Sequence, residues 1–181
     1  QLHRLLVNEL WLLGEEYALG ADDDSLKDLL RSHIRILGRS DLTAEPGVTI
    51  DDVKSIPDLM LYRRRKVDRD RFEHLVVELK RPSLVLGQDE TAQVRKYAFA
   101  VAQDERFDTK RCSWEFVLLG NSCDRFVELE SSSDHLPEGC ISARGGVRIW
   151  VRTWADVLND ARARYEFFRE RLNLEASQEH G

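Results

Sequence analysis

The chain has 181 residues, of which 42% are hydrophobic and 33% are charged, a composition typical of one globular domain with a substantial core. No apolar run approaches the roughly 20 residues of a membrane span and no signal peptide is recognisable, so we expect a cytoplasmic protein without membrane contact. The net charge of −6 by itself argues against a nucleic-acid partner. Because the chain begins with Gln1 rather than Met, we expect it to be part of a longer protein.

The N-terminal part of the chain is predicted to be helical and to pack on the remainder. Residues 2–13 have the apolar spacing of an amphipathic helix, and a second helix is predicted over residues 25–37. The polar segment 39–55 is predicted to form a loop or an irregular strand. We therefore divide the single domain into a helical part, residues 1–55, and a main part, residues 56–172.

Two strands are predicted next, over residues 56–63 and 72–81, and they are joined by a charged hairpin. Because side chains alternate along a strand, Glu78 and Lys80 share one face of the second strand, and the apolar residues around them occupy the other face. An ion pair on the exposed face of a strand is common and contributes little. The Glu-x-Lys pattern taken alone therefore favours an ordinary surface pair.

The remaining elements alternate between helices and strands. A helix over residues 88–103 has an apolar stripe formed by Val94, Tyr97, Ala98, Val101 and Ala102. Strands are predicted over residues 114–119, 125–130 and 147–151, with a loop over residues 131–146, a final helix over residues 154–172 capped by Thr153, and a frayed tail over residues 173–181.

Three residues add to the Glu-x-Lys pattern. Asp58 begins the preceding strand, directly after Pro57, and Gln93 and Tyr97 are four positions apart on the predicted helix, where they share a face. Two carboxylates and a lysine on adjacent strands are the groups needed to hold a divalent metal beside a water molecule and a phosphodiester. Tyr97 also belongs to the apolar stripe, so packing is its expected main role.

These motifs resemble a known family. Pro57-Asp58, Glu78-Leu79-Lys80 and Gln93-Val94-Arg95-Lys96-Tyr97 resemble the PD-(D/E)XK nuclease superfamily, in the branch that has a Gln-x-x-x-Tyr helix. Residues 74–106 and the segment Trp11-Leu12-Leu13-Gly14-Glu15-Glu16-Tyr17 resemble Shedu-like nuclease domains, and similar segments occur at the ends of larger bacterial proteins with a GHKL-type ATPase region. The resemblance implies an α/β fold with a restriction-endonuclease-like αβββαβ core, a mixed central sheet, flanking helices and further helices at both ends.

The resemblance also implies a Mg²⁺-dependent deoxyribonuclease, with a role in defence against phage. Asp58 and Glu78 would bind Mg²⁺ or Mn²⁺, and Lys80 would orient or deprotonate the attacking water. Gln93 would position the water or a phosphate. An acidic residue of the first helix often completes such a site, and the candidates are Glu9, Glu15 and Glu16. DNA is the expected partner, and the chain is expected to form a homo-oligomer or to belong to a larger ATPase-containing chain.

Positive charge is concentrated between the two motif strands. Residues 1–61 contain six basic and twelve acidic residues, a balance of −6, whereas residues 62–81 contain eight basic and four acidic residues, a balance of +4. Local positive potential attracts phosphate even where the net charge is negative. A solvated hairpin tip would have the same composition, but the candidate nucleic-acid contacts are Arg63, Arg64, Arg65, Lys66, Arg81 and Tyr97.

The cysteines and histidines indicate no second kind of site. The three cysteines form no Cys-x-x-Cys pair, so reduced thiols are expected rather than a zinc site. His74 falls on the Glu78 side of its strand, about 13 Å away, and is expected either to support the site from behind or, as the favoured interpretation, to lie at the surface. Two alternatives to a nuclease stay open: a nuclease fold that binds nucleic acid or a partner without cutting, and an interaction platform within a larger ATPase protein. The intact motif argues against the first.

Overall fold

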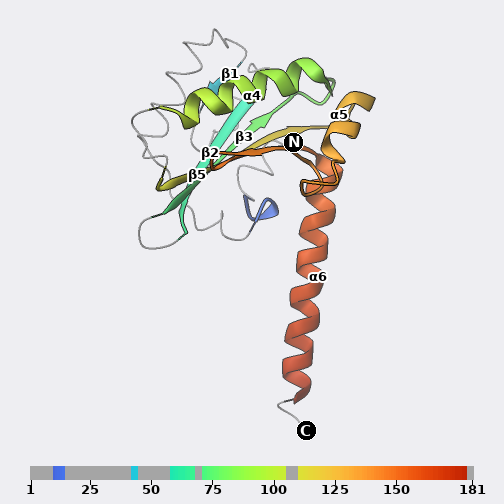
Figure 1. Ribbon diagram of the computed structural model, residues 1–181. Helices are drawn as coiled ribbons and strands as arrows, with labels where there is room; N and C mark the ends of the chain where they lie inside the picture. The colour runs from blue at the N-terminus through green and yellow to red at the C-terminus, as the bar shows by residue number, and fades with distance from the viewer. Residues whose placement is uncertain (1–9, 15–41, 45–57, 68–70, 105–109, 179–181) are drawn as a thin grey trace.

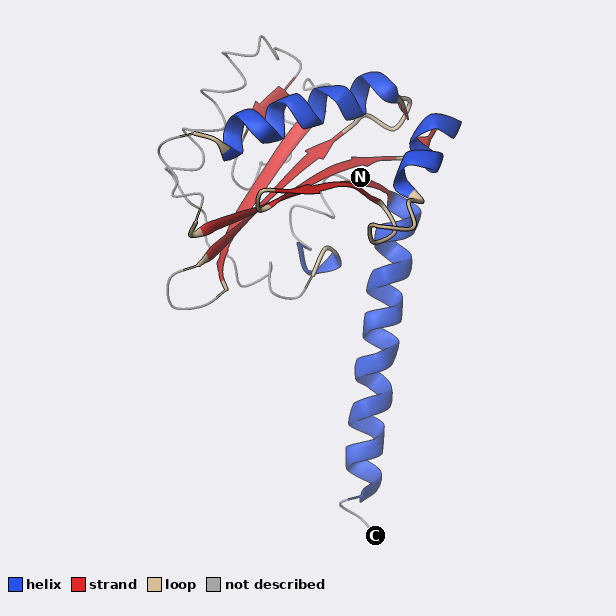
Figure 2. Cartoon of the chain, in the orientation of Figure 1, coloured by secondary structure: helices blue, strands red, loops and turns tan. Residues whose placement is uncertain are grey.

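The computed structural model describes residues 10–14, 42–44, 58–67, 71–104 and 110–178. The described residues form an α/β fold around a mixed sheet, shown in Figures 1 and 2. In chain order the elements are η1 (Leu10–Leu12), β1 (Leu42–Ala44), β2 (Asp58–Lys66), β3 (Phe72–Leu79), β4 (Val85–Leu86), α4 (Gln88–Ala102), β5 (Cys112–Gly120), β6 (Ser122–Cys123), α5 (Arg125–Ser131), β7 (Cys140–Arg144), β8 (Val147–Thr153) and α6 (Trp154–Gln178).

The main sheet has the strand order β1-β2-β3-β5-β8-β7. Strands β3, β5 and β8 are parallel neighbours, whereas β2 is antiparallel to β3 and β7 is antiparallel to β8. Strand β1 pairs in parallel with the start of β2, and β4 and β6 form a separate two-stranded sheet. The carboxyl ends of β3, β5 and β8 therefore lie at the same end of the sheet. In α/β proteins, functional groups are commonly located at this end.

Strand β3 is covered on both faces, which explains its nearly continuous apolar sequence. Its residue Val76 packs on the face covered by α4, in a core cluster with Tyr97, Trp114 and Phe116. Its residues Leu75, Val77 and Leu79 pack on the opposite face with Leu12 of η1 and Trp154 of α6. Figure 1 shows α4 lying across one face of the sheet, while α6 extends away from the sheet.

Helix α4 forms where its apolar spacing predicts. The Glu90 carboxylate accepts a hydrogen bond from the Gly87 backbone N–H at 2.9 Å, which satisfies one of the backbone donors left open at the start of the helix. The predicted stripe is buried along the whole helix. Among the described helices, none combines the length and the apolar character that a membrane crossing requires.

Two predicted elements in the second half of the chain are wrong. Residues 125–130 were expected to form a strand, yet Arg125–Ser131 is helix α5, capped by the Asp124 carboxylate, which accepts a 2.9 Å hydrogen bond from the Val127 N–H. The predicted loop contains strand β7, which completes the sheet by pairing with β8. Helix α6 continues to Gln178, beyond the predicted end at Leu172, and Thr153 caps it as predicted, accepting a hydrogen bond from the Asp156 N–H.

The expected elements of the N-terminal part are only partly described. Residues 10–12 form the short 3₁₀ helix η1, and β1 lies within the segment predicted as a loop or irregular strand. The predicted helix over residues 25–37 lies outside the described residues.

Candidate active site

Glu78 and Lys80 form a buried ion pair at the carboxyl end of β3. The Lys80 Nζ atom lies 2.8 Å from the Glu78 Oε1 atom, and the two side chains are 3% and 2% exposed, respectively. The Lys80 backbone N–H donates a 2.9 Å hydrogen bond to the Leu119 carbonyl, so the pairing with β5 continues past the end of the strand and fixes the position of Lys80. The two residues share a face, as predicted. The prediction of an exposed surface ion pair, which the Glu-x-Lys pattern alone favoured, is wrong because both side chains are buried.

Burial of this pair is costly. Removing a carboxylate and an ammonium group from water costs several kcal/mol per ion, and a buried pair is rarely more stabilising than apolar residues of the same size. Such pairs are enriched at functional sites, where charge is needed in a place that excludes water. Glu78 and Lys80 are therefore the strongest candidates for a functional role in the described part of the chain.

Asp58 is brought to the same place by the pairing of β2 with β3. Met60 is directly opposite Glu78, and Leu59 is opposite Leu79. Continuing this register places Asp58, the first residue of β2, opposite Lys80. Because Asp58 is two positions before Met60, it falls on the face of the sheet that carries Glu78. The three motif residues thus converge at one end of two neighbouring strands.

The donor set suits a hard divalent cation. The Glu78 carboxylate is described directly, and the backbone register places the residue Asp58 at the same end of the sheet. Oxygen donors of this kind bind Mg²⁺ or Mn²⁺. Within the described side chains, which do not include that of Asp58, no group of three or more His, Cys, Asp or Glu residues could hold a metal. The acidic candidates Glu9, Glu15 and Glu16 lie outside the described residues.

The two residues of the Gln-x-x-x-Tyr motif have different surroundings on α4. Gln93 is exposed, whereas Tyr97 is buried and meets Phe116 edge-on, with ring centroids 6.2 Å apart. The packing role predicted for Tyr97 is confirmed. Its burial leaves little of the ring for contact with nucleic acid. Arg81, directly after Lys80, is exposed.

The basic cluster lies elsewhere than predicted. Residues 63–66 were expected in the connection between the two strands, but β2 continues through Lys66, and Arg64 pairs with His74. Alternation along β2 places Arg64 and Lys66 on one face and Arg63 and Arg65 on the other. At about 3.3 Å per residue, the cluster begins roughly 16 Å along the strand from Asp58. Positive charge is therefore concentrated at the far end of the strands and not beside the carboxylates.

His74 is the second correction. It was expected at the surface, yet it is 1% exposed and stacks on Trp114, with ring centroids 4.4 Å apart. Its position on the α4 face follows from the same alternation that places Glu78 there. The sequence contained a signal for this burial. Val76, which lies between His74 and Glu78 on the same face, is apolar, and a face covered by a helix is buried along its whole length.

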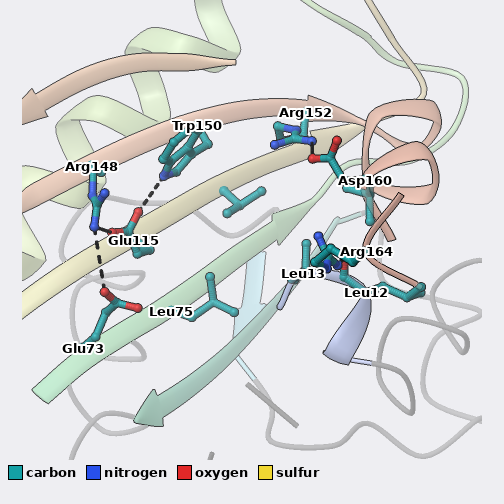
Figure 3. Close-up of a pocket in the computed structure, with 12 residues that line it drawn as sticks. Leu12, Leu13, Glu73, Leu75, Glu115, Arg148, Trp150, Arg152, Asp160 and Arg164 are labelled. Atoms are coloured by element: carbon teal, nitrogen blue, oxygen red, sulfur yellow. Dashed lines mark hydrogen bonds and ion pairs between the residues drawn. The ribbon is translucent and has the colours of Figure 1, made fainter. Parts of the chain in front are cut away.

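A polar cluster on the opposite face of the sheet has no counterpart in the sequence predictions. A cavity of about 310 Å³ lies between the sheet, η1 and α6, with Glu73 and Arg148 toward one end and Arg152 and Asp160 toward the other (Figure 3). The Arg148 Nη2 atom lies 2.6 Å from the Glu115 Oε1 atom and 3.9 Å from the Glu73 Oε2 atom.

Glu115 is the most perturbed acid of this cluster. Burial raises the pKa of its carboxyl group, although the 2.6 Å hydrogen bond from the Trp150 indole N–H and the charge of Arg148 act in the lowering direction. The neighbouring Glu73 carboxylate adds to the rise in pKa. The Glu115 and Glu73 carboxylates thus share the guanidinium group of Arg148, and Arg152 pairs with Asp160 at the other end of the cavity.

Comparison of the chain with known protein families, with curated proteins and with solved structures finds no match. The features that point to a function are therefore the motif residues and the geometry of Asp58, Glu78 and Lys80.

Proposed function

We propose that this chain is a metal-dependent nuclease of the PD-(D/E)XK type, which hydrolyses phosphodiester bonds in DNA. The observation that carries the proposal is the buried Glu78–Lys80 pair, at the same strand end and on the same sheet face as Asp58. Apart from the two-residue strand β4, the order β2, β3, α4 and β5, with β5 parallel to β3, is compatible with the later part of a restriction-endonuclease-like αβββαβ core. A phage-defence role, and membership of a homo-oligomer or a larger ATPase-containing chain, belong to the proposal through the motif resemblance alone.

Each residue has a role that follows from its chemistry. Asp58 and Glu78 would hold the cation, which when bound supplies positive charge to the phosphate and lowers the pKa of a bound water. Lys80 has three N–H donors, one of which is directed to Glu78, so its ammonium group can also orient the attacking water and stabilise negative charge on the phosphate. Water attacks phosphorus and loses a proton to solvent as the P–O bond forms, the bond from phosphorus to the leaving oxygen breaks, and that oxygen takes up a proton from solvent.

Two exposed residues, Gln93 on α4 and Arg81 directly after Lys80, complete the proposal. The Gln93 side chain offers both a donor and an acceptor, which suits it to position water or a phosphate oxygen. Arg81 suits contact with the phosphate backbone because its guanidinium group can donate two parallel hydrogen bonds to one phosphate. Tyr97 supports this region from within the core.

The burial of the pair also favours a second candidate function. With exposures of 3% and 2%, Lys80 and Glu78 are reached by a metal and a phosphate only if covering groups move. A nuclease fold that binds nucleic acid or assembles within a larger protein, without cutting, would keep the pair covered. The two functions differ in whether DNA is ever hydrolysed.

A plasmid-cleavage assay with Mg²⁺ or Mn²⁺ distinguishes them. We expect the unmodified chain to cut, and Lys80→Ala and Asp58→Ala each to lose at least about a hundredfold in rate, because preorganised charge at a reacting centre contributes on that order. The control is Arg125→Ala, which removes a cation that is 79% exposed on α5, and it should cut normally.

Two outcomes would contradict the proposal in different ways. If the unmodified chain binds DNA and RNA in every form but never cuts, the non-catalytic function is correct. If Lys80→Ala and Asp58→Ala cut as fast as the unmodified chain, the chain is a nuclease with its site elsewhere. Each variant is checked for folding by its denaturation midpoint, so that loss of structure is not mistaken for loss of chemistry.

A further inference from the structure

The outer part of helix α6 extends beyond the body of the molecule. Near the start of the helix, Trp154, Val157 and Ala161 are buried in the core cluster that also contains Leu12. From residue 165 to residue 172 every side chain is exposed. Figure 1 shows this part of α6 extending away from the sheet. The described residues therefore provide packing for only the first part of the helix.

An apolar stripe runs along α6 through both parts. Its members recur at alternating intervals of four and three residues: Trp154, Leu158, Ala161, Tyr165, Phe168 and Leu172. Such a repeat of about 3.5 residues is the pattern by which one α-helix packs against another in a coiled coil. The body covers the beginning of the stripe, whereas Tyr165, Phe168 and Leu172 are 62%, 50% and 65% exposed. These three residues continue an established packing face into solvent.

The outer part of α6 lacks the contacts that normally stabilise a helix. Isolated helices shorter than about 12 to 15 residues are marginal in water, and most helical stability in proteins comes from the packing of an apolar face. A contiguous exposed apolar surface commonly marks a site of interaction with another molecule. The spacing and the exposure of the stripe together favour a second helix as the group that covers it.

The charged residues of α6 are sorted by position around the stripe. In heptad notation, Leu158, Tyr165 and Leu172 occupy position a, and Ala161 and Phe168 occupy position d. The helix contains five acidic and four basic residues. All four basic residues lie at the flanking positions e and g: Arg162, Arg164, Arg169 and Arg171. The acidic residues between Leu158 and Leu172 lie at positions b, c and f, away from the stripe: Asp160, Glu166 and Glu170. Positive charge therefore borders the stripe on both sides.

These arginines decide which kind of helix fits. Arg164 donates hydrogen bonds to two backbone carbonyls of η1 and so belongs to the body. Arg162, Arg169 and Arg171 are exposed and form no ion pair with another residue of the described part of the chain. In a coiled coil, the e and g residues of one helix face those of the partner helix. Two copies of α6 would set arginine against arginine in either orientation, whereas acidic e and g residues would compensate the arginines.

We propose that the outer part of α6 binds an amphipathic helix of a partner protein, with apolar residues at positions a and d and acidic residues at positions e and g. The three exposed residues of the stripe pack between the apolar residues of the partner, and the three unpaired arginines pair with its carboxylates. Apolar packing supplies affinity, and the charges select the partner. The interaction uses no residue of the Glu78–Lys80 site, so it is independent of whether the chain cuts DNA.

Fluorescence anisotropy with two labelled helical peptides tests the proposed chemistry of the partner. Both peptides have about four heptads with leucine at a and d; one has glutamate at e and g, and the other has lysine there. The glutamate peptide should bind the unmodified chain at least about tenfold more tightly than the lysine peptide, because like charges across an interface oppose binding. Raising the salt concentration should weaken the binding of the glutamate peptide.

Two adjacent phenylalanines provide a matched pair of variants. Phe168 lies at position d of the stripe, whereas Phe167, which is 58% exposed, lies at position c. Phe168→Ala should weaken the binding of the glutamate peptide by about tenfold or more, as truncation of a central apolar contact commonly does. Phe167→Ala should leave the binding unchanged. Neither phenylalanine belongs to a core cluster, and circular dichroism checks that α6 persists in both variants.

Charge reversal tests the role of the arginines. With Arg162→Glu, Arg169→Glu and Arg171→Glu combined, the lysine peptide should bind more tightly than the glutamate peptide. The control combines Glu166→Lys and Glu170→Lys, which change the charge of α6 at positions b and f. This control should keep the preference of the unmodified chain for the glutamate peptide.

Four results would overturn the inference. The first is a glutamate peptide that binds no more tightly than the lysine peptide. The second is an equal loss of binding in Phe167→Ala and Phe168→Ala, since that would indicate unspecific apolar adsorption. The third is self-association of the unmodified chain, measured by light scattering, that Phe168→Ala abolishes, since a second copy would then cover the stripe. The fourth is displacement of the glutamate peptide by duplex DNA from the unmodified chain, since the arginines would then serve a nucleic acid.

The same measurements separate this inference from the proposed function. A chain that never cuts DNA but prefers the glutamate peptide, with the expected effects of the Phe168 and Phe167 variants, would refute the nuclease proposal alone. A chain that cuts DNA but binds neither peptide would refute the docking of an acidic helix alone.

Discussion

The buried contact between Glu78 and Lys80 makes each residue depend on the other. With both present, the two charges compensate within a place that excludes water. With one removed, the remaining charge stays buried without its partner, which typically costs about 3 to 5 kcal/mol. Removing both charges relieves that penalty, so the effects of the two substitutions should be strongly non-additive.

We therefore expect Lys80→Met to lower the free energy of unfolding by about 3 kcal/mol, and Glu78→Leu combined with Lys80→Met to lower it by clearly less. Urea denaturation of the single and double variants measures the coupling. Free energies that simply add would mean that the pair is solvated in solution, and the argument for a buried functional centre would then lose its basis.

Glu115 leads to a dependence of stability on pH. Burial raises its folded-state pKa above the unfolded value, so the folded chain holds an additional proton over the interval between the two values. The free energy of unfolding contributed by Glu115 is therefore fully present below the unfolded pKa and is lost as the pH rises through the folded pKa. The cause is desolvation, which the Trp150 and Arg148 contacts only partly offset.

Glu115→Gln removes this loss while keeping a side chain that can accept a hydrogen bond from Trp150. Relative to the unmodified chain, the variant should become progressively more stable as the pH rises from about 4 to about 8. Chemical denaturation at several pH values gives the difference directly. A difference that stays constant or falls with pH would show that burial does not dominate the titration of Glu115.

At the scale of elements, the small sheet of β4 and β6 makes a close contact with the main sheet. Leu86 of β4 is fully buried and packs on Gly120, the last residue of β5. A Cβ atom at Gly120 would lie 2.8 Å from the Leu86 Cγ atom, closer than real contacts allow. Glycine at position 120 leaves room for the buried Leu86 side chain.

Gly120→Ala should therefore destabilise the chain by about 1 to 3 kcal/mol, the usual cost of overpacking. Leu86→Ala makes room for the added methyl group, so Gly120→Ala should cost much less in that background. Thermal or urea denaturation of the two single variants and the double variant tests the coupling. If Gly120→Ala costs the same in both backgrounds, another part of the chain sets the need for glycine.

The elements differ in how far the sequence could predict them. Those determined by a local pattern of residues were predicted, whereas those determined by pairing with a distant strand were not. In α4, the spacing of Val94, Tyr97 and Val101 has one interpretation, and the helix forms as predicted. In α5, the short segment from Arg125 to Glu130 mixes polar and apolar residues without a clear period, and the Asp124 cap selects a helix of which Val127 is the buried residue. Strand β7 was missed because its partner β8 supplies the pairing.

At the scale of the whole molecule, the candidate site was predictable in its residues but not in its surroundings. Alternation along one strand sufficed to place Glu78 and Lys80 on one face. The convergence of Asp58 with them required the register of β2 and β3, which depends on the pairing of the two strands and cannot be read from either strand alone. Four consecutive basic residues are typical of a turn, yet pairing with buried β3 extends β2 through them and moves positive charge to the opposite end of the sheet.

The polar cluster of Glu115, Arg148 and Trp150 on the opposite face of the sheet could not be predicted for the same reason. Glu115 and Trp150 are 35 positions apart in the chain, and their hydrogen bond exists only because β5 and β8 pair. Neither residue belongs to a recognisable local motif. Contacts that depend on pairing between distant strands have no signature in a window of sequence.

The central position of β5 has a consequence for how the chain acquires its structure. β5 pairs in parallel with β3 on one side and with β8 on the other, and parallel strands meet only after a long intervening segment has closed. Folding dominated by such non-local pairings commonly takes milliseconds to seconds. During synthesis β5 leaves the ribosome before β8 does. Until β8 pairs with it, the backbone N–H and C=O groups on one edge of β5 can pair with strands of other chains. Correct folding of this domain therefore requires that β8 pairs with β5 faster than β5 aggregates with other chains.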